Sequence, residues 1–423
     1  MKLCRVVTAA ATAALVLSCA SPAPALVNTG ELHILVILAT WGPQPFARAD
    51  IQQIVFHDAD AFVRENSYGT AWLTGEVTPW VNAFPSPPGC GTPTQQQSLA
   101  TAAQAAAKQA GFDPSTYSRF IYVFPAESSC GYAGYGSLRE VYLNGVVDPM
   151  IVSHELGHTF GLSHAHTIDC SGTCSFVEYG DPYDTMGHGT GDYNAYEKHL
   201  AGWLTNVTDA HNGTFEIDAL EPKSSSPQAF VIQTAHNEYW LDHREPLLGD
   251  AWLAGQPIVG GVEVHAGPPS SDPTAPSDWN TDNTLVPNPA GTGLPVILPG
   301  QTFSERGAFQ LTVIDHVGTH VDVKFAWTDT TRPTAPALDS PAKSSHALTL
   351  DVEWEPATDT GSGIDHYVVT LDGKQRATVR ADFTLPLRAT VGKLAPGRHT
   401  LSVFAVDRAG NRGRATTRVL SVR

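Results

Sequence analysis

The sequence predicts an α+β domain followed by two all-β, sandwich-like domains. Three observations predict this organisation. Helix-like and strand-like patterns alternate in the first half of the chain, only strand-like runs recur in the second half, and a Thr/Pro-rich linker precedes the last strands. A chain of 423 residues with 37 glycines and 31 prolines fits two or three turn-rich domains. The expected segments are a first domain at 26–209, a β-rich domain at 210–328, a linker at 329–341 and a β-sandwich at 342–423.

The first 25 residues are typical of a secretory signal peptide. Two basic residues precede the apolar run Val6–Leu17, and a small-residue cleavage site ends at Ala25. The alternative is a lipid-anchored Cys19, but Leu17 fits a lipoprotein cleavage site poorly. No other stretch is long and apolar enough to cross a bilayer. We therefore expect a secreted, extracellular protein without a transmembrane anchor.

Four cysteines remain after removal of the signal: Cys90, Cys130, Cys170 and Cys174. An even number in an exported protein indicates disulfides. Three pairings are open, and we prefer Cys170–Cys174 for a small loop with Cys90–Cys130 for a larger one. A cysteine-based metal site is the weaker alternative, because histidines provide a better one.

The elements of the first domain follow from local patterns. Leu32–Ala39 is a continuous apolar run with β-branched residues, which is typical of a buried strand. Apolar residues at helical spacing predict a helix over Ala47–Asn66, and the Ala-rich segment Gln95–Ala110 predicts another. In the helix expected over Asp148–Gly161, Asp148 is the N-cap and a proline opens the first turn. The other expected elements are strands at Ala71–Val77, Phe120–Phe124 and Glu140–Leu143, and a helix at Tyr193–Trp203.

Strand-like runs fill the rest of the chain. Residues 267–299 interrupt them with a long loop of turn-forming residues. In the last segment we expect Trp354 and Tyr367 in the core and Asp372-Gly373 as a hairpin turn. The expected strands are Thr214–Ile217, Ala229–Thr234, Tyr239–His243, Gly261–His265, Gln310–Asp315, His320–Trp327, Leu348–Trp354, Tyr367–Leu371, Thr400–Ala405 and Thr417–Val422.

Five residues of uncommon type stand at fixed spacing in the run HELGHTFGLSH, which begins at His154. His154 and His158 are four residues apart, so on a helix both imidazoles face one ion. Gly161 can take a positive φ, end the helix and turn His164 towards that ion as a third ligand. Three neutral imidazoles form a zinc ligand set with one position left for water, whose proton Glu155 can accept. The spacing therefore predicts a catalytic zinc site.

A solvated, His-rich helix end is a weaker interpretation of this run. Such a helix end would not explain why five residues of uncommon type stand at this fixed spacing. A structural zinc site would give Glu155 no role, and no fourth protein ligand is evident. His166 could replace His164 as a ligand, but the spacing from Gly161 favours His164. Calcium binding is possible but is not predicted, because no loop has the spacing of its ligands.

Residues downstream add to the pattern. Tyr183–Gly187 supplies Met186 for a Met-turn, and Asn194–Lys198 leads to a short Ala-Gly-Trp-Leu segment. With the histidine run, these residues resemble the metzincin metallopeptidases, and among them the gametolysin family of secreted peptidases, over roughly 30–210. The resemblance implies a zincin-type α+β catalytic domain, one zinc ion, endopeptidase activity on protein or peptide substrates, Glu155 as general base and a floor formed by Met186.

One position departs from a familiar metzincin pattern. Some members place a tyrosine two residues after the Met-turn methionine, where it can approach the metal or the reaction intermediate. In this chain that position is His188. We hypothesise that His188 stabilises the oxyanion or binds zinc weakly, and the alternative is an ordinary histidine of a surface loop.

The last segment resembles bacterial Ig-like or fibronectin type III modules. Its most recognisable pieces are Ser362-Gly363-Ile364 and Val406–Asn411, beside the alternating strands. Such modules share their pattern widely, so the resemblance is silent about a ligand.

The net charge of the chain limits the classes of partner that we expect. A net charge of −17 disfavours general binding to nucleic acid or to anionic membranes. Residues 26–332 hold 33 acidic and 11 basic residues, a net charge of −22, whereas residues 333–423 carry +3. The module at 342–423 is therefore the candidate for contact with an anionic wall or matrix surface, and we expect a monomer.

Two more functions are compatible with the sequence. The chain could be an extracellular adhesion or binding protein in which the β modules bind the partner. It could also be a zinc hydrolase that acts on cell-wall peptides.

Overall fold

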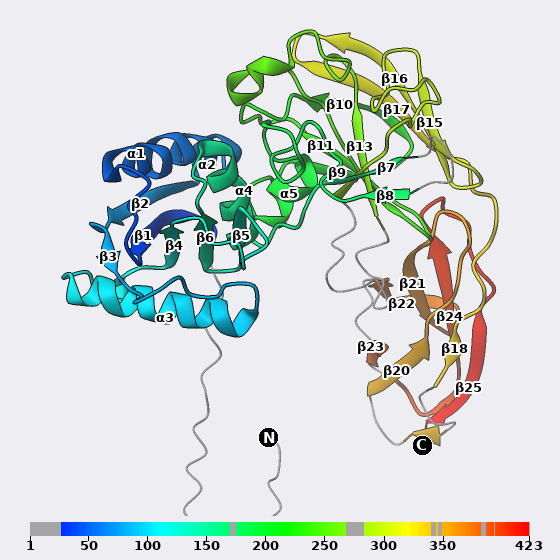
Figure 1. The fold of residues 1–423 in the computed structure, drawn as a ribbon. Helices are drawn as coiled ribbons and strands as arrows, with labels where there is room; N and C mark the ends of the chain where they lie inside the picture. Colours follow the sequence, from blue (N-terminus) through cyan, green and yellow to red (C-terminus); the bar gives the residue numbers. More distant parts are fainter. Residues whose placement is uncertain are drawn as a thin grey trace, which may run out of the picture.

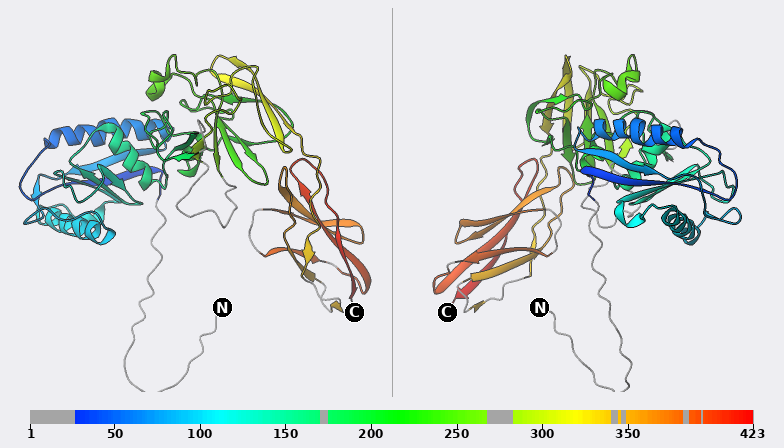
Figure 2. Two further views of the ribbon diagram at one scale, coloured as in Figure 1. Left: turned by 45° about the vertical axis from the view of Figure 1, so that its right-hand side comes forward. Right: turned by 90° about the vertical axis from the view of Figure 1, so that its left-hand side faces the viewer.

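The computed structural model arranges the chain as three blocks, and the second lies between the other two (Figures 1 and 2). The signal segment, Cys170 and Cys174 lie outside the described residues. Among the helices that are described, none has the length and apolar character to cross a membrane. The structure describes residues 27–169, 175–267, 283–339, 344–345, 349–381, 386–392 and 394–422.

The first block is a mainly parallel sheet covered by helices on both faces (Figure 1). Strand order is β2-β1-β4-β6-β5, with β3 beside the end of β1, and β5 alone runs antiparallel to its neighbour. Its strands are β1 (Gly30–Thr40), β2 (Ala71–Val77), β3 (Val81–Asn82), β4 (Arg119–Phe124), β5 (Gly134–Gly136) and β6 (Glu140–Asn144). Its helices are α1 (Arg48–Gln53), η1 (Ile54–Ala59), α2 (Asp60–Asn66), α3 (Pro93–Gln109), η2 (Pro114–Thr116), α4 (Pro149–Thr159) and α5 (Ala195–Leu200).

Burial on both faces explains the continuous apolar run of β1. Ile34 and Val36 pack with residues of α1, α2 and α4, whereas Leu35 and Ile37 pack against α3. A central parallel strand needs apolar side chains at every position because helices cover both sides. The apolar faces of the helices and the apolar residues of β1 therefore bury each other.

The elements predicted in this block are found with small changes. The helix expected over residues 47–66 is one helical run with a π-helical segment, η1, in its middle. The last helix is shorter than expected: Asn194 caps it through the Glu197 N–H, and Gly202, at φ +82°, follows its end. The predicted disulfide Cys90–Cys130 is confirmed, with a Cα–Cα distance of 4.6 Å.

The second block pairs a four-stranded sheet, β10-β17-β16-β15, with a seven-stranded sheet, β8-β7-β14-β13-β12-β11-β9. Apolar residues of both sheets, including Ile217, Phe230 and Phe309, form one core. The elements are β7 (His166–Asp169), β8 (Ser175–Val177), β9 (Val207–Asp209), β10 (Gly213–Asp218), β11 (Ala229–Gln233), β12 (Glu238–Asp242), η3 (Leu248–Leu253), β13 (Glu263–Gly267), β14 (Thr284–Leu285), β15 (Thr302–Glu305), β16 (Phe309–Val317) and β17 (His320–Trp327).

The seven-stranded sheet crosses the boundary expected between residues 209 and 210. β7, β8 and β9 precede that point, yet β9 pairs with β11, and β7 pairs in parallel with β14. The β7–β8 hairpin is too short to be stable alone. The first two segments are therefore interleaved in one sheet, and the division at 209 stays a prediction.

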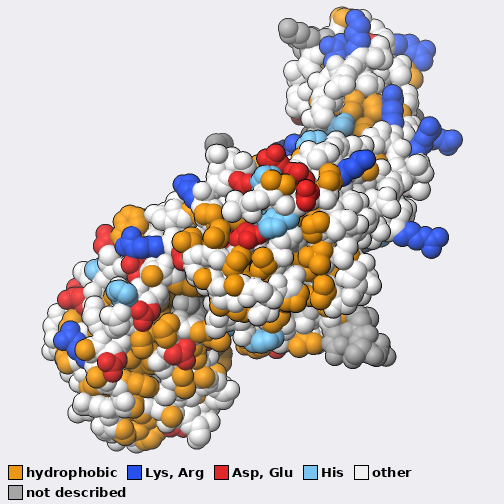
Figure 3. Space-filling model, turned by 90° about the horizontal axis from the view of Figure 1, so that it is seen from above, with side chains coloured by type: hydrophobic (Ala, Val, Ile, Leu, Met, Phe, Trp, Pro, Cys, Tyr) orange, Lys and Arg blue, Asp and Glu red, His pale blue; other side chains and the backbone are white. Residues whose placement is uncertain are grey.

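The third block is a sandwich of a three-stranded sheet, β18-β20-β23, and a five-stranded sheet, β19-β25-β24-β21-β22. Trp354 and Tyr367 lie in its core, and Asp372 and Gly373 turn the hairpin at φ +52° and +76°. Lys and Arg side chains gather on this block (Figure 3, upper right). The strands are β18 (Ala337–Leu338), β19 (Ser344–Ser345), β20 (Thr349–Glu355), β21 (Ile364–Leu371), β22 (Lys374–Arg380), β23 (Leu387–Gly392), β24 (Gly397–Asp407) and β25 (Thr416–Val422).

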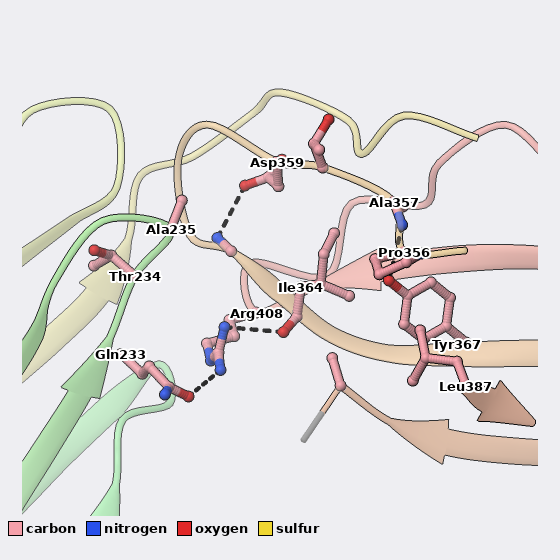
Figure 4. Close-up of a pocket in the computed structure, with 13 residues that line it drawn as sticks. Gln233, Thr234, Ala235, Pro356, Ala357, Asp359, Ile364, Tyr367, Leu387 and Arg408 are labelled. Carbon is pink, nitrogen blue, oxygen red and sulfur yellow. Dashed lines mark hydrogen bonds between the residues drawn. The ribbon is translucent and has the colours of Figure 1, made fainter. Parts of the chain in front are cut away.

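A cavity of about 230 Å³ lies where the second and third blocks meet (Figure 4). Arg408 spans the junction, because its guanidinium donates to the side-chain oxygen of Gln233 and to the Ile364 carbonyl. None of the predicted zinc ligands lines this cavity. Nearby, carboxylate oxygens of Asp329, Asp359 and Asp407 lie within 4.8 Å of one another. Calcium takes oxygen ligands of this type. No spacing in the sequence predicted this group.

Candidate active site

Helix α4 carries the first part of the site. Its first turn is fixed by the Asp148 carboxylate, which accepts a hydrogen bond from the Ile151 N–H at 2.9 Å, and by Pro149. It ends where Gly161 takes a φ of +92°, as predicted from the sequence. The chain then turns back and brings His164 beside the helix.

The three predicted zinc ligands converge. One ligand atom each from His154, His158 and His164 lies within 4.8 Å of the others, and the ring centroids are 4.9 to 5.3 Å apart. These histidines come from one helix and the loop after it, as the spacing indicates. His166 lies in β7, packs against Phe176 and is absent from this group.

Each of these rings is oriented through its Nδ1 atom. Nδ1 of His154 lies 2.8 Å from the Thr185 carbonyl oxygen, and Nδ1 of His158 lies 2.9 Å from that of Leu162. Nδ1 of His164 contacts a carboxylate oxygen of Glu178 at 3.0 Å. Since these acceptors hold the proton on Nδ1, each Nε2 keeps a lone pair for the point the rings share.

The electrostatics also fit a cation. Burial lowers the pKa of His158 and of His164 to about 4, and burial lowers the pKa of His154 as well. The imidazoles are therefore neutral at physiological pH, which is the form that binds metal. Three neutral nitrogen ligands with ordered outer partners suit a zinc ion.

Glu155 lies on α4 beside the ligands and is buried. Its Oε2 atom has no hydrogen-bond partner, and burial raises the pKa of Glu155 to about 8. Two glycines of β5 make room for it: a Cβ on Gly134 would lie 2.3 Å from Glu155 Oε1, and one on Gly136 would lie 2.5 Å from its carbonyl oxygen. An unpaired carboxyl oxygen beside three convergent imidazoles can accept and return a proton.

The predicted Met-turn lies beneath the helix. Met186 is fully buried, and its Sδ atom would be 2.3 Å from a Cβ at position 157, so Gly157 permits this approach. Asp184 shapes the turn, since its carboxylate accepts from the N–H groups of Met186 and Asn194. The Ala165 N–H donates to the Met186 carbonyl at 2.9 Å.

Tyr179 is a site residue that sequence reasoning missed. Its ring centroid lies 3.9 Å from that of His164 and 5.8 Å from that of His154. Burial raises the pKa of Tyr179, and the carboxylates of Glu178 and Glu155 add to this effect. Its backbone is left-handed, at φ +57°, which is uncommon for a residue with a side chain and frequent at functional sites.

His188, the residue hypothesised from the Met-turn spacing, lies behind Tyr179. It is exposed, and its Nδ1 atom is 2.6 Å from the Tyr179 carbonyl oxygen. It is not among the convergent ligand atoms of the described residues. In this arrangement His188 supports the backbone that presents Tyr179.

Residues of the second block contact the backbone of the Met-turn region. Arg244, which is buried, donates to the carbonyl oxygens of Tyr183 and Asp192 and forms an ion pair with Asp250. The amide of Asn283 donates to the His164 carbonyl at 3.2 Å. Charged groups this deeply buried need such partners, so the site and the second block share one polar core.

The sequence of this region has a known relative. Residues 61–240 match the family model of gametolysin peptidase M11. This segment is similar to the gametolysin peptidases. The match supports a metallopeptidase segment, and it spans α4, the histidines and the Met-turn. No curated protein matches the chain.

Solved structures match the chain only weakly. Fibronectin(III)-like modules of Clostridium thermocellum CbhA match with 21% identity and a TM-score of 0.17, over 21% of this chain and 95% of that one. The spore cortex lytic enzyme SleM of Clostridium perfringens matches with 18% identity and a TM-score of 0.19, over 26% and 38%. OgpA of Akkermansia muciniphila matches with 11% identity and a TM-score of 0.26, over 93% of each chain. At these TM-scores the likenesses carry no argument about the site.

Proposed function

We propose that this protein is a secreted zinc endopeptidase of the metzincin type. The observation that carries the proposal is the convergence of His154, His158 and His164 beside the unpaired carboxyl oxygen of Glu155. The family match supports a metallopeptidase. The signal-like segment and the Cys90–Cys130 disulfide support an oxidising, extracellular location.

The histidines would hold the ion, and Glu155 would move the proton. A bound zinc ion supplies Lewis-acid polarisation of the substrate carbonyl and lowers the pKa of a water molecule. The charge of a bound ion would lower the raised pKa of Glu155, so that its carboxylate oxygen could accept a proton from the attacking water and later donate it to the leaving amine. Burial keeps other water away from this carboxyl group, so the proton is not lost to solvent.

The edge strand β5 is the proposed binding place for the substrate backbone. In the described part of the chain it pairs with β6 alone, so its other edge can accept an added strand. Gly134 and Gly136 place this edge directly over Glu155 and His158. A peptide bound along β5 would therefore present its carbonyl groups to the three histidines.

Tyr179 is the proposed donor to the developing oxyanion, in the role that the sequence suggested for His188. The ring of Tyr179 packs against the ring of His164. The carboxylate of Glu155 is close enough to Tyr179 to influence its pKa. A phenol O–H can donate to a negatively charged oxygen without bringing a charge of its own.

The decisive experiment combines activity with metal content. The change Glu155→Gln should leave the histidine-bound zinc in place and lower kcat on a casein-like substrate by at least about 100-fold, the usual scale for a lost general base. A strong chelator should abolish activity of the wild type, and added zinc should restore it. Glu355→Gln, an exposed change in the third block, serves as the control. Activity that survives the chelator or the loss of Glu155 would rule out the proposal.

A further inference from the structure

A second group of metal-ligand side chains lies in the second block, apart from the peptidase histidines. It consists of His243, Glu245 and His316. His243 follows β12, where it forms an isolated bridge with Ala219, and His316 lies in β16. A β-bulge between residues 313 and 315 shifts the register of β16 against β17 just before His316.

The three side chains share one point. Glu245 Oε1 lies 3.1 Å from Nε2 of His243 and 2.8 Å from Nε2 of His316. All three atoms are shielded from solvent, and none of them makes a hydrogen bond. His243 is fully buried, and Glu245 is 9% exposed.

The tautomer of His243 is fixed by its other nitrogen. Its Nδ1 lies 2.8 Å from the Gly261 carbonyl oxygen, which can only accept, so Nδ1 holds the proton. The neutral ring then directs the lone pair of Nε2 towards Glu245, another acceptor. Two buried acceptors facing each other repel unless something positive lies between them.

A proton on the ring would be the simplest positive charge, but the geometry does not favour it. A charged imidazole would direct an N–H at the carboxylate oxygen and form a hydrogen bond. His243 and His316 each lie at ion-pair distance from Glu245, but neither contact meets the angular geometry of a hydrogen bond. Three inward-facing ligand atoms that need to separate by only a few tenths of an ångström would reach the roughly 3.3 Å spacing of ligands around one tetrahedral zinc ion.

We propose that His243, Glu245 and His316 bind a second divalent transition-metal ion, zinc by preference. Two imidazoles and one carboxylate are a common zinc ligand set, whereas calcium and magnesium take oxygen ligands. The side chain of His316 is 29% exposed, so the ion can enter from solvent and a water molecule can complete its coordination.

The position of this site gives it a structural role. His243 and Glu245 flank Arg244 in the stretch that follows β12; they contact each other, whereas Arg244 pairs with Asp250. Arg244 contacts the Tyr183 and Asp192 carbonyls behind the Met-turn. An ion held on one side would therefore fix the segment that supports the peptidase site from the other side.

The test is the zinc content of the purified full-length chain, measured by mass spectrometry of the metal after dialysis. We expect two zinc ions per chain for the wild type, and one for His316→Ala, whose ligand is partly exposed and whose loss should leave the fold intact. His158→Ala should also retain one ion, and the double variant none. The exposed residue His236 provides the control, since His236→Ala should retain two.

Three outcomes separate this site from the peptidase site. One ion in the wild type that His158→Ala removes would overturn the second site and leave the peptidase site standing. Two ions in His316→Ala would also overturn it. If His316→Ala fails to fold, Glu245→Gln replaces it, and we expect that change to weaken binding of one of the two ions at least about tenfold. Unchanged binding of both ions in that variant would count against the proposal.

Discussion

Gly157 and Met186 show how single residues determine how closely the Met-turn approaches helix α4. The glycine lies within helix α4, directly before the second histidine ligand, where an alanine would favour the helix by about 1 kcal/mol. The chain has glycine there because the methionine sulfur occupies the space of a Cβ. The helix gives up intrinsic stability so that the Met-turn can lie directly beneath it.

The change Gly157→Ala should therefore destabilise the protein. The new Cβ would stand 2.3 Å from Met186 Sδ and 3.1 Å from the hydroxyl oxygen of Tyr193. Overpacking of this kind costs about 1–3 kcal/mol, which outweighs the gain in helix propensity. Denaturant unfolding measures the difference. Gly392→Ala is a suitable control because its Cβ would meet only an ordinary contact at 3.9 Å.

Tyr179 and His188 can be separated by kinetics. If Tyr179 donates to the oxyanion, Tyr179→Phe should lower kcat by about 100-fold or more with little change in KM. His188→Ala should have a smaller effect, because the His188 imidazole contacts the backbone carbonyl of Tyr179 and is not among the convergent ligand atoms. A larger loss of kcat in His188→Ala than in Tyr179→Phe would restore the role that the sequence suggested for His188.

At this scale, local spacing predicts some residues and fails for others. His154 and His158 can be found because positions four apart share a helix face in any context. Tyr179 could not be found, since its place depends on a left-handed turn after β8. One weak signal was available: Tyr179 follows Glu178 within a short polar segment between the third histidine and the Met-turn.

At the scale of elements, the Met-turn is held by strands that lie far away in the sequence. β14 pairs with β7, and the loop after β12 supplies Arg244. Regular elements with strong patterns, such as β1 and α4, were predictable from the sequence. The β7–β14 pairing was not, because it joins two short strands across more than one hundred residues and has no periodic signal.

Removal of Arg244 tests this support. Arg244→Met would leave the buried carboxylates of Asp250 and Glu263 without their cation, and breaking a buried pair in this way costs about 3–5 kcal/mol. Thermal unfolding should show the loss as a lower Tm. The exposed Arg306 gives the comparison, since Arg306→Met should change stability by less than about 0.5 kcal/mol. Equal effects of the two changes would mean that the buried network contributes nothing.

At the scale of the whole molecule, Glu65 joins the first block to the second. Its carboxylate accepts a hydrogen bond from the Gly249 N–H in η3 at 2.6 Å. Burial raises the pKa of Glu65 to about 7, and the nearby carboxylate of Asp192 adds to the rise. The folded protein therefore binds this proton more tightly than the unfolded chain.

A pH dependence follows from that shift. Protonated Glu65 favours the folded state, so its contribution is complete below pH 4.5 and is lost as the pH rises to about 7. Glu65→Gln, which keeps the hydrogen bond to Gly249 and cannot ionise, should reduce the fall in stability between about pH 5 and pH 8. Urea unfolding of both proteins at these two pH values measures this. A variant with the same fall as the wild type would contradict it.

The order of the three blocks could be predicted from the composition of the sequence. The contacts that join the blocks could not be predicted from it. Alternating patterns and Gly/Pro-rich loops mark where helices give way to strands. The buried charge that joins the second block to the Met-turn region, Arg244 with the carbonyl oxygens of Tyr183 and Asp192, gives no such mark. Charged residues are normally exposed, so sequence alone assigns them to the surface.

The interleaved sheet also imposes an order of events during synthesis. The β7–β8 hairpin leads into the turn with Tyr179, and it lacks its neighbour until β14 has been made, about 115 residues later. A ribosome adds about 5–20 residues each second, so the loop that carries His164 waits several seconds for the last strand partner of β7. Under the proposed function, the surroundings of the three histidines would be complete only after β14 has been made and has paired with β7.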